Sequence, residues 1–439
     1  MTRTLLSGAV VVTCDERHTV HTPGDVLMED DRIAWVGREY QGEYDIRIPA
    51  AGRLVMPGLI NAHTHAPMTI FRSLADDVDL RVFLEERAWP RELKLTGEDV
   101  YAGAVLAGIE MLKCGVTSYV DMYFFEEDLA QAALDTGLRA TITPPIIETP
   151  AWRPLIGGWE RCIERALDFH GRWQGRAGRI SAGMGPHAPY SVPFEALGEV
   201  AAEARRAGMP VHIHLVETAA ERDGFNAGGR GSTVAALEDM GFFDGPVIAA
   251  HSVWLDDGDI DIYGRRDVGV AHCPQSNAKL GAGIAPVAAM LAAGVQIGLG
   301  TDGAATNNNL DLWEELRLAP LLAKVSALDP KPVSAQQALW MATRMGARAI
   351  HQPAIGALEP GRKADILMLS IEDSTAVPVF GPGTYIDHLV YAMGSQLVDS
   401  VWVNGRRVVK DREVLTVDEA GARQAARRAA MAVSERVGV

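Results

Sequence analysis

Two histidines separated by one residue follow a short apolar run early in the chain, in the segment Pro57–His65. Alternate residues of an extended strand point to the same side, so His63 and His65 can offer their imidazoles to one metal ion. A second pair of the same kind, His212 and His214, ends another apolar run. Two solvent-facing histidines are the simpler interpretation of a single pair, but the repetition favours a metal centre.

Further ionisable residues follow other apolar runs in the same way. They are Asp121, His187, Glu217, His251, His272 and Asp302. One buried histidine is more often a hydrogen-bonded core residue than a ligand. Several polar residues at equivalent places of a repeating pattern are better explained by one shared site. The sequence therefore predicts a metal-dependent hydrolase.

The elements that position these residues alternate along the chain. Helical periodicity separates eight apolar runs that predict strands, at residues 59–60, 117–120, 140–143, 180–184, 211–214, 247–250, 269–271 and 295–299. Thr96 begins one helix with a capping-box pattern, and Gly115 ends it. Eight alternating units predict an α/β fold with a (β/α)8 TIM barrel, whose active site lies at the carboxyl ends of its strands.

The two ends of the chain lack the strand–helix alternation of the centre. Residues 1–57 and 358–439 predict short strands, with hairpin turns at Glu29–Asp31 and at Asn404–Gly405. Neither segment is long enough to bury a core well alone, so we expect the two to pair beside a barrel over residues 58–357. A last helix is predicted over 418–436, with Ala and Val on one face and Arg on the other.

Composition narrows the class of partner and the compartment. The 439 residues carry a formal net charge of −16, which argues against binding to nucleic acid or to an anionic membrane. The four cysteines are far apart in the sequence and form no C-x-x-C pair. This spacing suits a protein of a reducing compartment and excludes a zinc site built from cysteine pairs. We interpret Met1–Val12 as a strand rather than a signal peptide, and no apolar run is long enough to span a bilayer, so the sequence predicts a cytoplasmic protein.

Other catalytic motifs are absent from the sequence. The cytidine-deaminase pattern needs H-x-E with P-C-x-x-C, which the cysteine spacing excludes. The H-E-x-x-H motif of zinc proteases and the G-x-S-x-G motif of serine hydrolases are also missing.

Taken together, the motifs resemble those of the amidohydrolase superfamily. The closest resemblance is to its 5′-methylthioadenosine/S-adenosylhomocysteine deaminase family, which is related to the triazine chlorohydrolases. It covers essentially the whole chain and depends on Pro57–His65, Gly185–Tyr190, His212–Glu217, His272–Leu280 and Gly300–Ala304. The resemblance implies that both terminal segments build one composite β-sandwich domain. Such enzymes often form homo-oligomers.

The resemblance also implies the ligands of one divalent ion, zinc first and ferrous iron second, namely His63, His65, His214 and Asp302. Imidazole suits both metals. His212, one strand alternation before His214, is the competing candidate; the family pattern favours His214, with His212 as neighbouring support. Binuclear relatives carry a carboxylated lysine at the end of the fourth strand. That strand ends here in Gly183–His187 without a lysine, so we expect a mononuclear site.

The chemistry implied is hydrolytic removal of the 6-amino group of an adenosine derivative, with release of ammonia. A metal lowers the pKa of bound water, so that hydroxide forms at neutral pH. Asp302 would accept the proton of that water, and His251 would polarise the hydroxide. Glu217 would transfer a proton to the purine ring nitrogen. The alternative for Glu217 is a solvated residue at a strand end.

Substrate contacts follow from the same resemblance. Glu92 would hold the ribose hydroxyls, because one carboxylate accepts two hydrogen bonds from a vicinal diol; a plain surface glutamate is the alternative. His187 would contact the purine side of the nucleoside substrate. Ser276, Asn277 and Lys279 would shape the loop after the seventh strand.

One departure from the family concerns the 5′ group. Relatives that act on S-adenosylhomocysteine hold its carboxylate with arginines, where this chain has Pro144 and Trp159, although Arg153 and Arg161 are nearby. We therefore expect an uncharged 5′ group, as in 5′-methylthioadenosine or 5′-deoxyadenosine, with Trp159 against the thioether.

Two other functions stay open at this point. The same scaffold would suit an aminohydrolase or chlorohydrolase of another heterocycle, such as a triazine or guanine, without a ribose anchor. A non-catalytic assembly protein is the third interpretation, but all the implied metal ligands are present.

Overall fold

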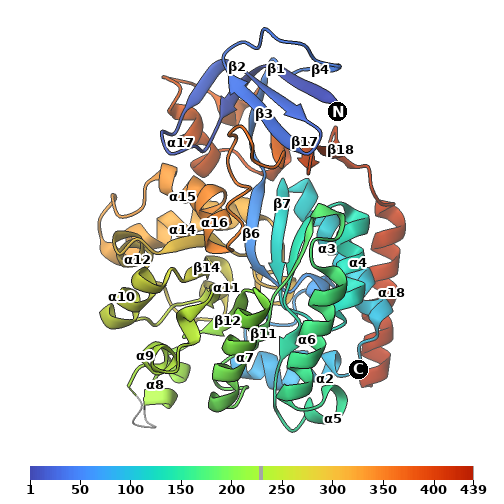
Figure 1. Cartoon of the computed structure of the whole chain (residues 1–439), viewed down its shortest axis with the longest axis vertical. Coiled ribbons are helices and arrows are strands. Elements are labelled where there is room, and N and C mark those ends of the chain that lie inside the picture. Colours follow the sequence, from blue (N-terminus) through green and yellow to red (C-terminus); the bar gives the residue numbers. More distant parts are fainter. Residues whose placement is uncertain (227–230, 439) are drawn as a thin grey trace.

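The computed structural model describes residues 1–226 and 231–438. A strand-rich unit formed by both ends of the chain lies above a ring of alternating strands and helices (Figure 1). The last helix, α18 (Glu419–Val437), runs down the outside of that ring. Among the described helices, none combines the length and the apolar character needed to cross a membrane.

The central strands form one parallel sheet of eight, in the order β10-β8-β7-β6-β15-β14-β13-β12. The sheet closes on itself, because a parallel bridge joins Met184, beyond β10, to Val211 in β12. Each of the eight predicted apolar runs overlaps one of these strands, although residues 143, 183–184 and 295 lie just outside them. Their bounds are β6 Leu59–Thr64, β7 Val116–Asp121, β8 Arg139–Ile142, β10 Ile180–Ala182, β12 Val211–Leu215, β13 Val247–His251, β14 Gly269–His272 and β15 Gln296–Leu299. The closed parallel sheet fits the predicted barrel.

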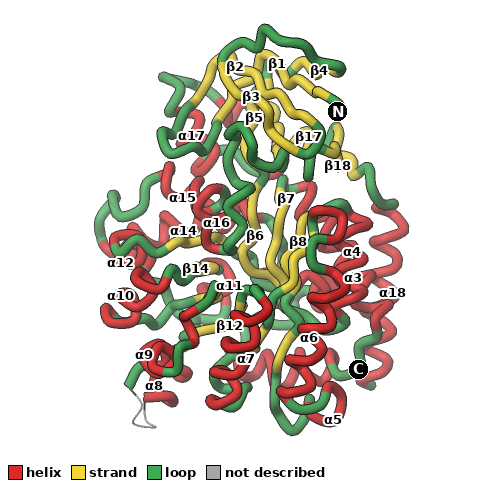
Figure 2. The backbone as a smooth tube through the Cα atoms, viewed as in Figure 1, coloured by secondary structure: helices red, strands yellow, loops and turns green. Residues whose placement is uncertain are grey.

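Helices cover the outside of the barrel (Figure 2). The predicted capping box is present, with Thr96 and Asp99 bonded reciprocally at the start of α3. Gly115 adopts a positive φ of 83° just beyond the end of this helix. Longer covering helices are α3 Gly97–Lys113, α4 Glu126–Thr136, α6 Trp159–Trp173, α7 Phe194–Ala207, α10 Asp257–Arg266 and α14 Leu312–Ala327. Shorter ones include α9 Thr233–Asp239, α11 Pro274–Lys279, α12 Val287–Ala292, α13 Ala304–Asn307, α15 Ala335–Met341 and α16 Arg344–Ala349. Helix α17 (Thr384–Tyr391) packs on α14 and α15.

Strands from both ends of the chain share one nine-stranded sheet, as expected. β5 pairs antiparallel with β16, so the first and last parts of the sequence meet at its centre. The two predicted hairpins are present, at Asp30 between β2 and β3 and at Asn404–Gly405 between β17 and β18. The composite sandwich and the domain limits at 57/58 and 357/358 stay predictions. The strands are β1 Arg3–Val12, β2 Val20–Glu29, β3 Arg32–Gly37, β4 Ile46–Pro49, β5 Arg53–Pro57, β16 Ile366–Ser370, β17 Val398–Val403, β18 Arg406–Lys410 and β19 Glu413–Val414.

Ion pairs join this sheet and the last helix to the barrel. Arg139 of β8 forms an ion pair with Asp365, next to β16, at 2.8 Å. Helix α18 lies along barrel helix α3, where Lys113 pairs with Glu419 at 2.9 Å and Arg436 pairs with Asp99 at 2.7 Å. The last helix therefore supports the barrel wall although it follows the terminal strands in sequence.

The segment between β6 and α3 is built from short helical turns and covers one side of the cavity at the strand ends. It contains η1 Ala66–Phe71, α1 Leu80–Val82, the π-helical turn η2 Phe83–Ala88 and α2 Trp89–Glu92. Two short extensions, β9 Pro145–Ile146 and β11 Gly185–Pro186, pair beyond β8 and β10 and bring Ile147 and His187 to the same cavity. We call residues 66–95 the covering segment.

Candidate active site

The carboxyl ends of four barrel strands converge on one buried cavity. His63 and His65 come from the end of β6, and His214 comes from β12. His251 is the last residue of β13, and Asp302 follows β15. Ligand atoms of His63, His65 and His214 lie within 4.8 Å of one another, and so do those of His63, His251 and Asp302. This convergence is the arrangement expected of a barrel active site.

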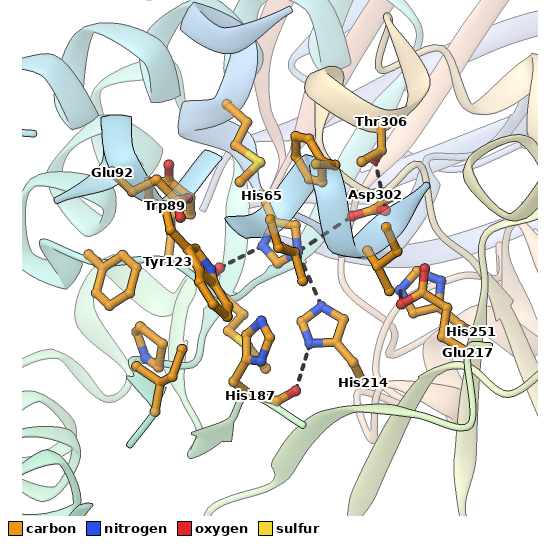
Figure 3. Close-up of a pocket in the computed structure, with 18 of the residues that line it drawn as sticks. His65, Trp89, Glu92, Tyr123, His187, His214, Glu217, His251, Asp302 and Thr306 are labelled. Carbon is orange, nitrogen blue, oxygen red and sulfur yellow. Dashed lines mark hydrogen bonds and ion pairs between the residues drawn. The ribbon is translucent and has the colours of Figure 1, made fainter. Parts of the chain in front are cut away.

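Two imidazoles face each other across the centre of the site. The Nε2 atoms of His65 and His214 are 3.2 Å apart. The Nδ1 atom of His65 lies 2.7 Å from the carbonyl oxygen of Met122, and that of His214 lies 2.7 Å from the carbonyl oxygen of His187. A carbonyl oxygen only accepts, so each Nδ1 carries the proton and each Nε2 presents a lone pair (Figure 3).

A chain of hydrogen bonds orients His63 in the same way. Thr143 donates from its hydroxyl to the carbonyl oxygen of Asp121 at 2.8 Å and lies 3.0 Å from Nδ1 of His212. Nε2 of His212 is 2.8 Å from Nδ1 of His63. Because the Thr143 hydroxyl donates its only proton to the carbonyl oxygen, Nδ1 of His212 donates to the hydroxyl oxygen. Nε2 of His212 therefore accepts a hydrogen bond from Nδ1 of His63. Both nitrogens of His212 are thus engaged, and His63 presents the lone pair of Nε2 to the site.

Asp302 completes the cluster with a fixed carboxylate. Its Oδ1 atom lies 3.3 Å from Nε2 of His63 and 3.4 Å from Nε2 of His65. Its Oδ2 atom accepts hydrogen bonds from the hydroxyls of Ser276 at 2.7 Å and Thr306 at 2.9 Å. Burial raises the pKa of Asp302, but the neighbouring imidazoles of His63 and His65 outweigh burial and hold that pKa well below its ordinary value.

These residues fit a divalent cation. Nε2 of His63 is buried and has no hydrogen-bond partner. Two further lone pairs point at each other from His65 and His214, and such an arrangement is repulsive without a positive charge between them. Burial lowers the pKa of His63 to about 4, which keeps this ring neutral and able to coordinate. Three neutral imidazoles and one carboxylate form a donor set suited to zinc or iron.

Glu217 and His251 lie together beside this cluster (Figure 3). Nε2 of His251 is 3.8 Å from Oε2 of Glu217, and both side chains are buried. Nδ1 of His251 is 2.9 Å from Oδ1 of Asn277. Burial raises the pKa of Glu217. Burial alone would lower the pKa of His251, but the carboxylates of Glu217 and Asp302 raise it. A buried carboxyl group beside an imidazole is a pair of residues suited to proton transfer.

The opposite end of the cavity is largely apolar and has one buried carboxylate. The open space of the cavity, including the solvent at its mouth, is about 650 Å³. Glu92 is 7% exposed, and burial raises its pKa to about 7, an effect partly offset by the Tyr123 hydroxyl. No lysine or arginine is among the described residues that line the cavity. Its apolar lining includes Met68, Leu80, Phe83, Leu84, Trp89, Phe124, Pro145 and Ile147.

Most of the residues predicted from sequence meet at this cavity. His65, Glu92, His187, His214, Glu217, His251 and Asp302 all line it. His187 is held by Ser191, whose hydroxyl oxygen is 2.7 Å from Nδ1, so Nε2 of His187 is the nitrogen available to a bound molecule.

Trp159 lies outside the described lining of the cavity. It is the first residue of α6, and its backbone N–H donates to Oε2 of Glu148 at 2.8 Å. Arg153 forms an ion pair with the same glutamate. The first turn of α6 thus binds Glu148 through its backbone, and the indole of Trp159 packs against the hydrophobic core. Its contact with substrate stays a prediction.

Sequence reasoning missed several residues of the site. Tyr123 and Phe124 line the cavity directly after β7, and Trp89 lines it three residues before Glu92. The position of Tyr123 just beyond Asp121 was a signal, because strand ends point to the site. No local pattern marks Thr306 as a partner of Asp302.

A closed parallel sheet with three convergent imidazoles and a carboxylate at its strand ends defines the class of metal-dependent barrel hydrolases. The sequence pattern described as "Amidohydrolase family" matches residues 54–408. The chain therefore belongs to the amidohydrolase family, as the resemblance of its motifs predicted.

Individual relatives are similar over nearly the whole chain. A 5-methylthioadenosine/S-adenosylhomocysteine deaminase of Pelotomaculum thermopropionicum is 43% identical over 427 residues, which cover 95% of this chain and 96% of the relative. A 5′-deoxyadenosine deaminase of Methanosarcina barkeri is 42% identical, with 99% of each chain covered. The crystal structure of an adenosine deaminase from Xanthomonas campestris with bound zinc is 32% identical, has a TM-score of 0.93 and covers 99% of each chain.

Proposed function

We propose that this protein is a metal-dependent hydrolase that deaminates adenosine derivatives with an uncharged 5′ group, such as 5′-methylthioadenosine and 5′-deoxyadenosine. The observation that carries the proposal is a single cavity with a cluster of metal-binding donors and a proton-transfer pair at one end and Glu92 at the other. Near-full-length similarity to deaminases of such nucleosides supports the same reaction.

His63, His65, His214 and Asp302 would hold one divalent ion, and when bound this ion supplies a strongly acidified water as nucleophile. We propose zinc, because the Xanthomonas campestris relative has bound zinc; ferrous iron is the second choice for the same donor set. One ion is expected, since the strand end at Gly183–His187 offers no lysine for a second.

Glu217 and His251 would handle the protons of the reaction. Burial raises the pKa of Glu217 and so favours its protonated form, and its carboxyl group would give a proton to the ring nitrogen beside the carbon under attack. His251 is anchored at Nδ1 by Asn277 and keeps Nε2 toward Glu217. Asp302, whose carboxylate is kept ionised, would receive the proton that the attacking water releases. Ammonia then leaves after a last proton transfer.

The remaining lining would orient the nucleoside. Glu92 would accept hydrogen bonds from the two ribose hydroxyls, at the end of the cavity away from Glu217 (Figure 3). His187 would contact the purine with Nε2, because its Nδ1 is held by Ser191. A nucleoside placed between these residues has its 6-position near the metal-binding cluster and its ribose under the covering segment.

We propose an uncharged 5′ group because no cationic side chain is among the described residues that line the cavity. A carboxylate is best recognised by a guanidinium, and the described lining has no arginine or lysine. Arg153, which we considered as a substitute, is paired with Glu148. A methylthio or methyl group would instead lie against apolar side chains such as Leu84 and Ile147.

We also propose that the reaction takes place in the cytoplasm. All four cysteines are free and buried, as expected in a reducing compartment.

An ammonia-release assay on the metal-loaded protein tests the proposal. 5′-Methylthioadenosine, 5′-deoxyadenosine, adenosine, S-adenosylhomocysteine, guanine and melamine would be compared at equal concentrations. We expect fast turnover of the first two and slow turnover of S-adenosylhomocysteine. A preference for S-adenosylhomocysteine would overturn the account of the 5′ group but keep the reaction. Activity on guanine or melamine alone would move the function to another heterocycle, and metal-loaded protein inactive on all six would contradict the proposal.

A further inference from the structure

The backbone that carries Glu217 bends sharply after β12. Val216 has a positive φ of 51°. This left-handed conformation is uncommon for any residue other than glycine and rare for a β-branched one. The bend turns the chain out of the strand and directs Glu217 into the cavity. Something must hold this turn in place, because Val216 itself disfavours it.

The carboxylate of Glu221 accepts hydrogen bonds from two backbone amides of this turn. Oε1 of Glu221 accepts a hydrogen bond from the backbone N–H of Val216 at 2.9 Å, and Oε2 accepts one from the N–H of Glu217 at 3.0 Å. The N–H of Glu221 donates to the hydroxyl of Thr218 at 3.1 Å. Glu221 lies in the first turn of α8 (Ala219–Asn226), but the amides it binds precede that helix. It is therefore not acting as an ordinary helix cap.

The same turn is tied to the strand end that carries His251. The carbonyl oxygen of Val216 accepts from the N–H groups of Val253 at 3.1 Å and Trp254 at 3.0 Å. His251 and Ser252 also have positive φ values, of 70° and 48°. The N–H of Ser252 donates to the carbonyl oxygen of Leu215 at 3.1 Å. Two left-handed turns thus lie side by side and place Glu217 against His251.

We propose that Glu221 is a positioning residue for Glu217. It binds the amides of Val216 and Glu217, and it is not among the described residues that line the cavity. Its effect on the reaction therefore passes through the direction of the Glu217 side chain. The inference rests on the proposed role of Glu217 in proton transfer. Without this carboxylate the turn would relax, and Glu217 would lose its alignment with His251 and the purine ring.

A double-mutant cycle separates positioning from a general structural role. The variants are Glu221→Ala, Glu221→Gln, Glu217→Gln and the Glu217→Gln/Glu221→Ala double variant. For each, kcat and KM on 5′-methylthioadenosine, bound zinc and the thermal unfolding midpoint would be measured. Misplacing a catalytic group by about 1 Å costs up to about 100-fold in rate, so Glu221→Ala should lower kcat about 10- to 100-fold. KM and bound zinc should stay near those of the parent.

Two further results are expected if Glu221 acts through Glu217. Glu221→Gln retains one acceptor oxygen, so its kcat should lie between those of Glu221→Ala and the parent. In the Glu217→Gln background, adding Glu221→Ala should change kcat by less than about twofold, because the group being positioned is already disabled. If Glu221→Ala does not fold, Glu221→Gln in the two backgrounds provides the same comparison.

Asp25 offers a matched control far from the site. Its two carboxylate oxygens accept backbone N–H groups from Gly8 at 2.8 Å and Tyr40 at 2.9 Å in the terminal sheet. Asp25→Ala should lower the unfolding midpoint and leave kcat unchanged.

Three outcomes would overturn the inference. Parent-like kcat in Glu221→Ala would do so directly. An equal loss from Glu221→Ala in the parent and Glu217→Gln backgrounds would show a structural role that does not pass through Glu217. Either of these first two results would leave the proposed function intact. Full activity of Glu217→Gln would instead remove the proton-transfer role of Glu217 and the inference with it.

Discussion

The two ends of the cavity are built on different principles. At the metal-binding end, each functional side chain comes from a barrel strand end, and a fixed partner orients it, as Met122 orients His65 and Ser276 orients Asp302. At the other end, the lining comes largely from the short helical turns of the covering segment and is mostly apolar. The comparison suggests that the barrel sets the reaction, whereas the covering segment sets which molecule undergoes it.

Removing a metal ligand should give the largest effect. His65→Ala deletes one of three convergent imidazoles, and a bound ion supplies several kcal/mol of transition-state stabilisation. We expect loss of bound zinc and a fall in kcat/KM of at least about 1,000-fold, measured by metal analysis and ammonia release. His351→Ala is the control, because this histidine bonds to the carbonyl oxygen of Val247 at the other end of β13. If His65→Ala bound as much zinc as the parent, His65 would not be a metal ligand, and the barrel end of the cavity would not be defined by the metal.

Glu217→Gln should come next. The amide cannot supply the proton, so kcat should fall by about 100- to 10,000-fold. Bound zinc should stay unchanged, which distinguishes this variant from His65→Ala. A kcat within about tenfold of the parent would show that another group moves the proton.

At the covering-segment end, Glu92→Ala should act on binding. Losing hydrogen bonds to a charged acceptor costs about 1.5–3 kcal/mol, so kcat/KM on 5′-methylthioadenosine should fall about 10- to 100-fold. The loss should vanish with a 2′,3′-dideoxy analogue, which has no diol. Glu86→Ala is the matched control, because Glu86 is exposed on the same segment. The same loss on diol and dideoxy substrates would exclude Glu92 as the ribose anchor.

The pH dependence of this contact has a defined sign. Burial raises the pKa of Glu92 to about 7, and only the ionised form accepts two hydrogen bonds from the diol. For the free enzyme, kcat/KM on 5′-methylthioadenosine should therefore rise with pH through about 7. Glu92→Gln should flatten that rise, and the dideoxy analogue should not show it in the parent. A rise that persists in Glu92→Gln would assign the ionisation to another group.

Trp159→Ala should have the smallest effect. Trp159 lies outside the described lining, whereas Trp89 is part of it. We expect kcat/KM to change less than about twofold for Trp159→Ala, and more for Trp89→Ala. A larger loss from Trp159→Ala than from Trp89→Ala on 5′-methylthioadenosine would restore Trp159 as the contact for the 5′ group.

The metal-binding end could largely be predicted from sequence because it follows local rules. Strand alternation puts His63 and His65 on one side, and the apolar runs locate the strand ends that carry His214, His251 and Asp302. The capping box at Thr96 and the hairpin at Asn404–Gly405 follow from equally local rules.

The covering-segment end could not be predicted in the same way. Its short turns have no sustained periodicity, so no sequence pattern shows which of its side chains face the cavity. Trp89 of this segment lines the cavity, whereas Trp159 of α6 lies outside the described lining, and nothing in the sequence distinguishes the two. The partners of individual side chains are equally hidden. Thr306 bonds to Asp302 through a turn, and His212 bonds to His63 across 149 positions. The sequence predicts a supporting role for His212, but only the fold shows that the residue it supports is His63.

The most direct test is a zinc titration of the chelator-stripped protein, followed by ammonia release from 5′-methylthioadenosine. Ligand atoms of His63, His65 and His214 lie within 4.8 Å of one another, and Oδ1 of Asp302 lies 3.3 and 3.4 Å from Nε2 of His63 and His65. No lysine follows the fourth strand. We predict no activity without metal, and a linear recovery that stops at one ion per chain. Activity in the stripped protein, or recovery that continues to two ions per chain, would contradict a mononuclear metal-dependent deaminase.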